Sequence, residues 1–397
     1  MLKENLIVKY QELAKDLGLS KFMMVVKDSD TIYFTKDGKS ASKTTIQDYI
    51  SKGFRAKLAC KALNKGANVV AIFNNSNILK AGDLGGIPTM LDDFTEIFGG
   101  EIKSVAKDEK KIYKELKKRK AVIVKGEYCI IASRSLDEAG TMARIICKNA
   151  FVMLKAQWFV TINPFVAKLM NIGYTSYYSK LNQAKVWNKE KTEPIETVKI
   201  KPITFEEIES ADKKEQALLV AKKLYQENFT QGTWGNVSIR IDDKTLYCTP
   251  KAIGYNILKV DDIVTMNYLH NKQLSTGVKA TSEKGIHCRV MREHKDAYVV
   301  VHAHPTFSSV LAARTQDLDI SEEGKAILGD RVYCSEHALP MTKRLANNTV
   351  DSREKNAVFM GNHGVAVYGK DIREVFLVLS TLEKEAKKYL DNNSKSN

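Results

Sequence analysis

Residues 298–305 read YVVVHAHP, and this stretch decides how the second half of the chain folds. The run Val299 to Val301 is entirely apolar, which is typical of a strand buried inside a sheet. His302 and His304 follow at its end. Side chains alternate along a strand, so histidines at i and i+2 point to the same face and can bind one metal ion. Two strand-end histidines held only by hydrogen bonds would give the same pattern.

A second apolar strand ends on a third histidine. Residues 357–364 read AVFMGNHG, which places His363 in a turn between Gly361 and Gly364. Glycine permits a positive φ and a close approach of backbones. Three neutral imidazoles with an open fourth position are typical of a catalytic zinc site. The two motifs together predict a divalent-metal site on His302, His304 and His363.

A carboxylate stands near these motifs in the chain. Thr281, Ser282 and Glu283 precede a helix predicted over 286–293, with the threonine or the serine as its N-cap. Glu283 could bind the metal, or be displaced by substrate and act as a general base. The alternative is a first-turn glutamate that complements the helix dipole. His287 follows on the same helix face, where it either supports the site or, more simply, packs or caps locally.

The motifs, taken in order, resemble the class II aldolase/adducin family over nearly all of residues 208–390. The resemblance also includes GTWGNVSIR at 232–240 and the pair Thr249-Pro250. It implies a three-layer α/β/α domain around a mixed, mostly antiparallel sheet. It implies one Zn²⁺ per chain, held in the carboxy-terminal domain by the three histidines.

The resemblance further implies a zinc-dependent lyase that cleaves a ketose 1-phosphate by a retro-aldol reaction. Glu283 corresponds to the family's general acid/base. The family's phosphate-binding residues correspond to Thr233, Asn236, Thr281 and Ser282. Lys251, followed by Ala252, stands where the family has a small polar residue and a glycine. This lysine could bind the phosphate directly, or it could block the usual cradle of backbone amides.

Other reactions on the same metal site stay open. The family's general-acid tyrosine has no counterpart around 320–329, which offers Glu322 and Glu323 instead. A pentulose-phosphate 4-epimerase and a thio-sugar-phosphate dehydratase are therefore alternatives, although the epimerases favour aspartate where this chain has Glu283. A non-enzymatic, adducin-like scaffold is a further alternative, but such members usually lose the histidines.

The first half of the chain repeats the pattern of the second without its chemistry. Aligning the strands places Ile72, Asn74 and Glu127 opposite His302, His304 and His363, and Lys52 or Gly53 opposite Glu283. We therefore predict a duplication, with a degenerate, metal-free domain over 1–192 and a metal-binding domain over 193–397. The degenerate copy would act as a scaffold that supplies an interface, which predicts a homo-oligomer.

Composition limits the other classes of function. The net charge of +15 comes from lysines spread along all 397 residues, with no nucleic-acid-binding signature, so no nucleic-acid partner is expected. No apolar run is long enough to cross a bilayer, and the amino terminus does not resemble a secretory signal. Six scattered cysteines are typical of buried, reduced thiols. These features predict a cytoplasmic protein, and the resemblance implies a phosphorylated sugar as its substrate.

Overall fold

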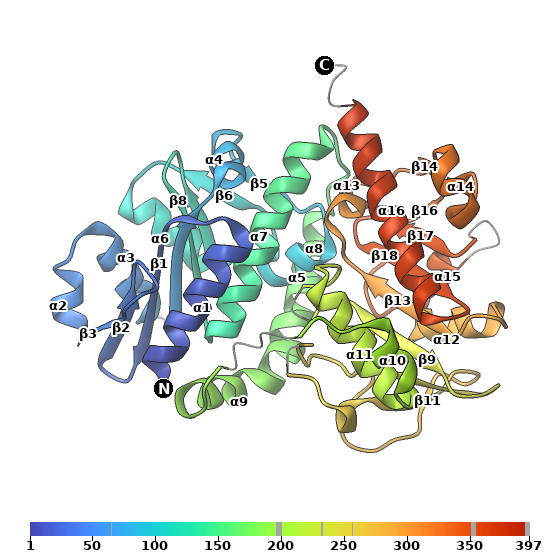
Figure 1. The fold of residues 1–397 in the computed structure, drawn as a ribbon. Coiled ribbons are helices and arrows are strands. Elements are labelled where there is room, and N and C mark those ends of the chain that lie inside the picture. Colours follow the sequence, from blue (N-terminus) through green and yellow to red (C-terminus); the bar gives the residue numbers. More distant parts are fainter. Residues whose placement is uncertain (65, 196–200, 232, 256, 351–354, 394–397) are drawn as a thin grey trace. The chain divides into compact units, whose positions relative to one another are not determined.

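A computed structural model describes residues 1–64, 66–195, 201–231, 233–255, 257–350 and 355–393, and for 177–185 it describes the backbone alone. The chain divides into two compact units (Figure 1). The amino-terminal unit comprises Met1–Leu154 and Ile162–Thr197, and the carboxy-terminal unit comprises Lys155–Thr161 and Val198–Asn397. The boundary predicted at residues 192 and 193 lies a few residues before this division.

The first part of the chain forms one eight-stranded sheet and the helices around it. Its strands are β1 (Ser20–Asp28), β2 (Thr31–Thr35), β3 (Ser42–Thr45), β4 (Val69–Asn74), β5 (Gly86–Ile87), β6 (Ile102–Val105), β7 (Ala121–Val124) and β8 (Tyr128–Ser133). Its helices are α1 (Leu2–Leu17), α2 (Ile46–Ile50), α3 (Phe54–Leu63), α4 (Ser76–Asp83), α5 (Asp92–Phe98), α6 (Glu109–Arg119), α7 (Leu136–Ala156), α8 (Pro164–Gly173), the π-helix η1 (Tyr174–Tyr178) and α9 (Ser179–Thr192).

The carboxy-terminal unit has its own eight-stranded sheet and a small two-stranded one. The large sheet contains β9 (Asn236–Arg240), β10 (Thr245–Cys248), β11 (Val264–Asn267), β12 (Lys272–Gln273), β13 (Val299–Ala303), β16 (Cys334–Ser335), β17 (Ala357–Met360) and β18 (Gly364–Gly369), and the small one β14 (Leu318–Asp319) and β15 (Arg331–Val332). The helices are α10 (Phe205–Ser210), α11 (Lys213–Gln226), the 3₁₀-helix η2 (Val260–Asp262), α12 (Lys284–Glu293), α13 (Thr306–Arg314), α14 (Glu322–Leu328), α15 (Lys343–Thr349) and α16 (Ile372–Asn393).

The two large sheets share one strand order. In the amino-terminal unit it runs β3-β2-β1-β4-β8-β7-β6, and in the carboxy-terminal unit β11-β10-β9-β13-β18-β17-β16. Every neighbouring pair in these runs is antiparallel except β6 with β7 and β16 with β17, which are parallel. Each sheet is therefore mixed and mostly antiparallel, as the resemblance to the family implied.

The registers of the central strands match as well. On β4, Ile72 pairs with Ile130 of β8, and on β13, His302 pairs with Ala366 of β18. In the next hairpins, Val124 pairs with Tyr128 and Met360 pairs with Gly364. These positions are equivalent in the alignment of the two halves made from the sequence. The duplication itself remains a prediction, which the common strand order and registers favour.

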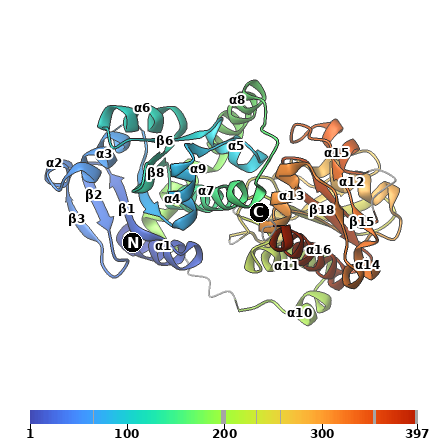
Figure 2. The ribbon, with the colours of Figure 1, turned by 90° about the horizontal axis from the view of Figure 1, so that it is seen from above.

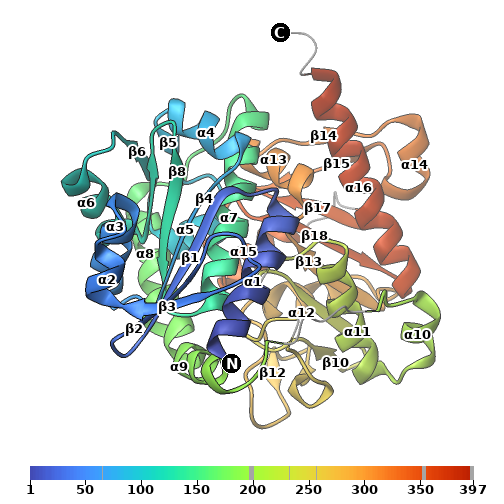
Figure 3. The ribbon, with the colours of Figure 1, turned by 60° about the vertical axis from the view of Figure 1, so that its left-hand side comes forward.

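Helices cover both faces of each sheet. In the amino-terminal unit α3 and α6 lie on one face and α1 and α7 on the other (Figures 2 and 3). In the carboxy-terminal unit α12 and α15 lie on one face, and α11, α13 and α16 on the other (Figure 2). One core packs α3 and α6 against the sheet through Val70 and Val122. Another packs α12 and α15 against Val300 and Val358. The three-layer α/β/α fold is confirmed in both units.

The long helices agree with their apolar periodicity. Helix α7, over Leu136–Ala156, and helix α16, over Ile372–Asn393, each bury apolar residues at three- and four-residue spacing. Helix α12 begins at Lys284, earlier than predicted, and its N-cap is Glu283 instead of the expected Thr281 or Ser282. Within the described ranges, no helix combines the length and apolar character that crossing a membrane requires.

Candidate metal centre

The HAH motif lies where a central strand of the carboxy-terminal sheet ends. His302 is on β13 and pairs with Asn236 of β9 on one side and Ala366 of β18 on the other. His304 follows just after the strand, and its backbone N–H donates to the carbonyl of Phe229. Both imidazoles are buried, each 1% exposed. A fully paired strand thus holds two histidines on the same side.

The turn between β17 and β18 brings the third histidine to them. The positive φ expected at a glycine occurs instead at Asn362, with φ 57°, and asparagine tolerates this conformation better than most residues. The glycines serve the close approach of backbones. A Cβ at Gly361 would lie 2.6 Å from a backbone carbonyl oxygen, and one at Gly364 would lie 2.5 Å from the carbonyl oxygen of Ala303. Close packing of β18 thereby positions His363.

The three imidazoles face one another through their Nε2 atoms. His302 Nε2 lies 2.9 Å from His304 Nε2 and 3.1 Å from His363 Nε2. Ligand atoms of all three lie within 4.8 Å of one another. Zinc–nitrogen bonds of the usual length in a tetrahedron place ligand nitrogens about 3.3 Å apart. The donor set therefore fits a divalent metal ion, and no other such group of His, Cys, Asp or Glu occurs among the described residues.

The first histidine is prepared for metal binding by its surroundings. His302 Nδ1 lies 2.9 Å from the carbonyl oxygen of Val365, a partner that can only accept, so Nδ1 carries the proton. Burial holds the pKa of His302 well below its usual value. The ring is therefore neutral, and its Nε2 presents a lone pair to the cluster. A carbonyl behind a ligating imidazole is the usual way in which proteins fix ring orientation.

Glu283 completes the cluster from the start of α12. Its Oε1 lies 2.9 Å from His363 Nε2, and its Oε2 lies 3.2 Å from His302 Nε2. The side chain makes no capping hydrogen bond to α12, although Glu283 is the N-cap residue. Burial pushes the pKa of Glu283 upward, but the neighbouring histidines and its hydrogen bonds outweigh burial and hold the pKa well below 4.5. The carboxylate faces the histidines instead of serving the helix end.

A buried chain of hydrogen bonds holds this carboxylate in place. Asn236 Nδ2 donates to Glu283 Oε2 at 2.8 Å, and Asn236 Oδ1 accepts from His287 Nε2. His287 Nδ1 in turn lies 2.8 Å from Ser238 Oγ. Burial lowers the pKa of His287 to about 4, so this ring is neutral near pH 7. His287 therefore supports the site, the role that the sequence offered beside local packing.

The residues expected to bind phosphate come from three segments of the chain, which contain Thr233 with Asn236, Lys251, and Thr281 with Ser282. Thr233 is exposed, while its neighbour Gly232 lies outside the described residues. Thr281 is buried, accepts the Glu283 N–H through its hydroxyl and donates its own N–H to Thr249. Asn236 uses both ends of its amide on Glu283 and His287. Its side chain thus positions the carboxylate.

The loop at Lys251 and Ala252, where the sequence differs from the family pattern, has an unusual backbone conformation. Ala252 adopts φ 60°, a conformation that glycine takes at little cost. The backbone N–H of Lys251 donates to the carbonyl of Lys279 at 2.8 Å. Alanine therefore occupies this loop in the conformation that glycine favours.

A basic cavity opens beside Glu283. Its volume is about 340 Å³, and Ser282 and Glu283 both line it. Four cationic side chains contribute to its walls: Lys284, Arg289, Arg292 and Lys343. Such walls suit an anionic ligand, although none of the three histidines lines this cavity.

Comparison with known proteins identifies the family. The family model "Class II Aldolase and Adducin N-terminal domain" matches residues 215–390. An L-fuculose phosphate aldolase from Methanocaldococcus jannaschii is 32% identical over 180 residues, which cover 45% of this chain and 96% of that protein. The chain belongs to the class II aldolase/adducin family. Residues 1–214 lie outside the match, so membership rests on the carboxy-terminal unit.

Two further proteins with sugar-phosphate chemistry in their names are similar to this chain. A 5-deoxy-D-ribulose 1-phosphate aldolase from Bacillus thuringiensis serovar kurstaki is 27% identical over 183 residues, covering 46% of this chain and 85% of that protein. A methylthioribulose-1-phosphate dehydratase from Bacillus cytotoxicus is 28% identical over 164 residues, covering 38% of this chain and 76% of that protein. The resemblance seen in the motifs is thus confirmed, and it spans more than one reaction.

The carboxylates around 320–329 are engaged at the surface. Glu322 lies 2.5 Å from Lys325, and Glu323 lies 2.9 Å from Lys388.

A tyrosine that the motifs did not single out lies elsewhere, in the loop after Thr249-Pro250. Tyr255 is 2% exposed, burial raises its pKa, and the charge of Glu283 adds to this increase. Its proximity to Glu283 arises from tertiary packing, which local sequence does not reveal.

The equivalent positions in the amino-terminal unit carry different chemistry. Ile72 has no donor atom, and Asn74 Nδ2 donates to the backbone carbonyl of Glu127 at 2.6 Å. Tyr128 stands on β8 where β18 has Gly364. Since even a Cβ at Gly364 would crowd two histidines, a tyrosine side chain at the matching position is incompatible with the same metal centre.

Proposed function

We propose that the carboxy-terminal unit is a zinc-dependent sugar-phosphate aldolase that cleaves a ketose 1-phosphate to dihydroxyacetone phosphate and an aldehyde. The observation that carries this proposal is the buried cluster in which Glu283 lies within 3.2 Å of His302 and 2.9 Å of His363. Relatives named as sugar-phosphate aldolases support the choice of reaction.

The metal would be held by His302, His304 and His363, one ion per chain. A divalent ion there would supply Lewis-acid stabilisation of the negative charge that develops on the substrate's oxygens. Glu283 now occupies the open side of the histidine cluster, so entering substrate displaces its carboxylate. Asn236 keeps the displaced carboxylate oriented, because its amide remains anchored on His287.

Proton transfer is then the task of Glu283. During cleavage the C4 hydroxyl loses its proton, the bond between C3 and C4 breaks, and C4 becomes the carbonyl carbon of the aldehyde. The proton released from this hydroxyl balances the one that Glu283, once protonated, delivers to C3 of the three-carbon fragment, which becomes dihydroxyacetone phosphate. In synthesis the carboxylate removes that proton. The phosphate group would lie among Thr233, Thr281, Ser282 and Lys251, with the cationic wall of the neighbouring cavity attracting it.

Dehydration of a thio-sugar phosphate is the second candidate. The relative named methylthioribulose-1-phosphate dehydratase favours it, and a glutamate at position 283 suits either reaction. Epimerisation and a non-enzymatic scaffold have less support, because the epimerases favour aspartate at this position and scaffolds usually lose the histidines. We also propose a homo-oligomer, to be tested by light scattering on the full chain.

Metal content and product analysis test the proposal together. We expect about one zinc per chain in protein purified without chelator, its loss in a His302→Ala, His304→Ala variant, and its retention in His270→Ala, whose histidine lies in an exposed turn. L-fuculose 1-phosphate and 5-deoxy-D-ribulose 1-phosphate should yield dihydroxyacetone phosphate, and Glu283→Gln should abolish this with zinc still bound. Metal-loaded protein that releases water from methylthioribulose 1-phosphate, and no aldehyde from either ketose, would establish the dehydratase instead.

A further inference from the structure

The amino-terminal unit has a cavity where the other unit has its metal centre. Its volume is about 520 Å³, within the range of small-molecule sites. Met23 lines it and pairs across the sheet with Ile72, as Asn236 pairs with His302. Glu127 lines it at the position matching His363. The cavity thus occupies the same place in the fold while its chemistry differs.

Cationic side chains dominate the rim of this cavity. The five that line it are Lys21, Lys36, Lys52, Arg55 and Lys107. The one carboxylate among the lining residues is that of Glu127, and its Oε1 lies 2.9 Å from Lys107 Nζ. The other four cations form no ion pair with any carboxylate of the described residues. An excess of positive charge therefore surrounds an opening that no protein anion fills.

The floor of the cavity is aromatic and apolar. Phe22, Met23, Tyr49 and Phe54 contribute to it beneath the charged rim. Lys107 Nζ lies 5.8 Å from the ring centroid of Phe54, and the guanidinium carbon of Arg55 lies 5.6 Å from that of Tyr128. These rings hold the cationic groups at the mouth through cation–π contacts. A ligand that fits has an anionic group for the rim and a less polar body for the floor.

A buried hydroxyl in the cavity wall lacks a partner. Tyr128 is 2% exposed, and its Oη makes no hydrogen bond to any described residue. Buried polar groups are normally hydrogen-bonded, so an orphaned hydroxyl in a cavity indicates a missing partner. Burial, with the Glu127 charge adding to it, raises the pKa of Tyr128 to about 12, so the hydroxyl keeps its proton and can donate. Helix α3 also begins here, at Phe54, and its N-cap residue Gly53 offers no side-chain cap.

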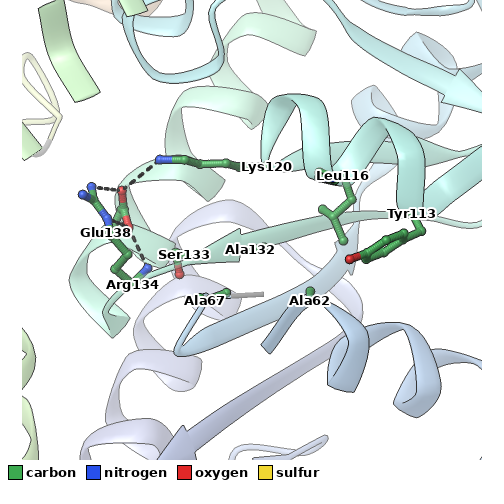
Figure 4. Close-up of a pocket in the computed structure, with 11 residues that line it drawn as sticks. Ala62, Ala67, Tyr113, Leu116, Lys120, Ala132, Ser133, Arg134 and Glu138 are labelled. Atoms are coloured by element: carbon green, nitrogen blue, oxygen red, sulfur yellow. Dashed lines mark hydrogen bonds and ion pairs between the residues drawn. The ribbon is translucent and has the colours of Figure 1, made fainter. Parts of the chain in front are cut away.

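A second cavity of the same unit has a smaller excess of positive charge. It measures about 240 Å³, and its Lys120 and Arg134 both point at Glu138 (Figure 4). Arg134 Nη2 contacts Glu138 Oε1 at 2.5 Å, and Lys120 Nζ lies 3.9 Å from the same oxygen. One buried carboxylate thus contacts both of these cations, while Lys117 also lines this cavity. Of these two cavities, the larger one has the greater excess of positive charge, which favours an anionic ligand.

We propose that the amino-terminal unit binds a small phosphorylated molecule in the cavity lined by Lys52, Arg55 and Tyr128. The phosphate lies between the rim cations and accepts from the Tyr128 hydroxyl, and the body of the molecule rests on the aromatic floor. The degenerate copy is then a ligand-binding domain in its own right. This proposal does not depend on the reaction proposed for the carboxy-terminal unit.

Titration calorimetry with inorganic phosphate on the metal-free full chain tests this inference. The pocket variant is Lys52→Gln, Arg55→Gln, and its matched control is Lys110→Gln, Lys114→Gln, which removes the same charge from exposed positions of α6. The carboxy-terminal site is intact in both. We expect a binding event in wild type and control that weakens about tenfold or more in the pocket variant, because charge-assisted hydrogen bonds are lost.

Two further measurements keep the result decisive. Tyr128→Phe retains every cation and removes only the orphaned hydroxyl, so it should also weaken phosphate binding, with an unchanged circular dichroism spectrum. If the double substitution unfolds the unit, Lys36→Gln serves in its place. Equal phosphate affinity in pocket and control variants at about 0.15 M salt would overturn the proposal, since it would show only a diffuse effect of net charge.

Discussion

Asn236 Nδ2 lies 2.8 Å from Glu283 Oε2, and this hydrogen bond joins the first strand of the carboxy-terminal sheet to the start of α12. The amide oxygen of Asn236 accepts from His287, so the asparagine cannot rotate without losing both partners. In the proposed reaction the Glu283 carboxylate moves away from the histidines and still transfers a proton at a defined position, so it needs a hydrogen-bond partner that keeps it oriented.

Replacing this asparagine should separate positioning from metal binding. In Asn236→Ala we expect kcat to fall about tenfold to a hundredfold, the range typical of residues that orient metal-site groups, while zinc content stays at the wild-type level. Steady-state kinetics beside elemental analysis measures both. Asn348→Ala, at an exposed hydrogen bond of α15, is the control. Loss of zinc in Asn236→Ala would show instead that the asparagine maintains the cluster itself.

The cluster of three histidines could be predicted from the sequence because its geometry is local. The spacing of His302 and His304 on an apolar strand fixes their common side, and the turn around His363 repeats a strand-end motif. The Asn236–His287 link joins two segments far apart in the chain, so no local pattern reveals it. The amino-terminal cavity was missed for the same reason. Lys21, Lys52 and Lys107 come from separate segments and, in sequence, are indistinguishable from other lysines.

The buried ring of His287 should make folding stability depend on pH. Its pKa of about 4 in the folded protein lies below the unfolded value of 6.5, so between these values only the unfolded chain takes up the proton. Stability is therefore lost as pH falls from about 6.5 towards 4, by up to about 3 kcal/mol, and this group contributes no pH dependence above that window. Urea unfolding at pH 7.5 and 5 measures the change. His287→Gln should show a smaller loss, and an identical loss in both proteins would exclude this source.

Gly364 should not tolerate even one added methyl group. In Gly364→Ala the new Cβ would lie 2.5 Å from the carbonyl oxygen of Ala303, 3.3 Å from His302 and 3.4 Å from His304. We expect a loss of stability of about 1–3 kcal/mol, typical of overpacking, together with weaker zinc binding. Gly173→Ala is the matched control, because a Cβ there meets nothing within 4 Å. Wild-type zinc affinity in Gly364→Ala would mean that β18 can shift without moving the histidines.

The loop at Ala252 should gain stability from a glycine, the residue that the resemblance to the family implies at this position. Ala252 holds φ 60°, which costs an alanine roughly 1 kcal/mol that glycine avoids. Glycine also raises the entropy of the unfolded chain, so the net gain of Ala252→Gly is expected to be a few tenths of a kcal/mol up to about 1 kcal/mol. Ala326→Gly, inside α14, has only the entropic cost and should lose about 1 kcal/mol. Chemical denaturation of both variants gives the comparison. If Ala252→Gly loses as much as Ala326→Gly, the loop does not hold the left-handed conformation in solution, and Lys251 would be free to present its amide differently to a bound phosphate.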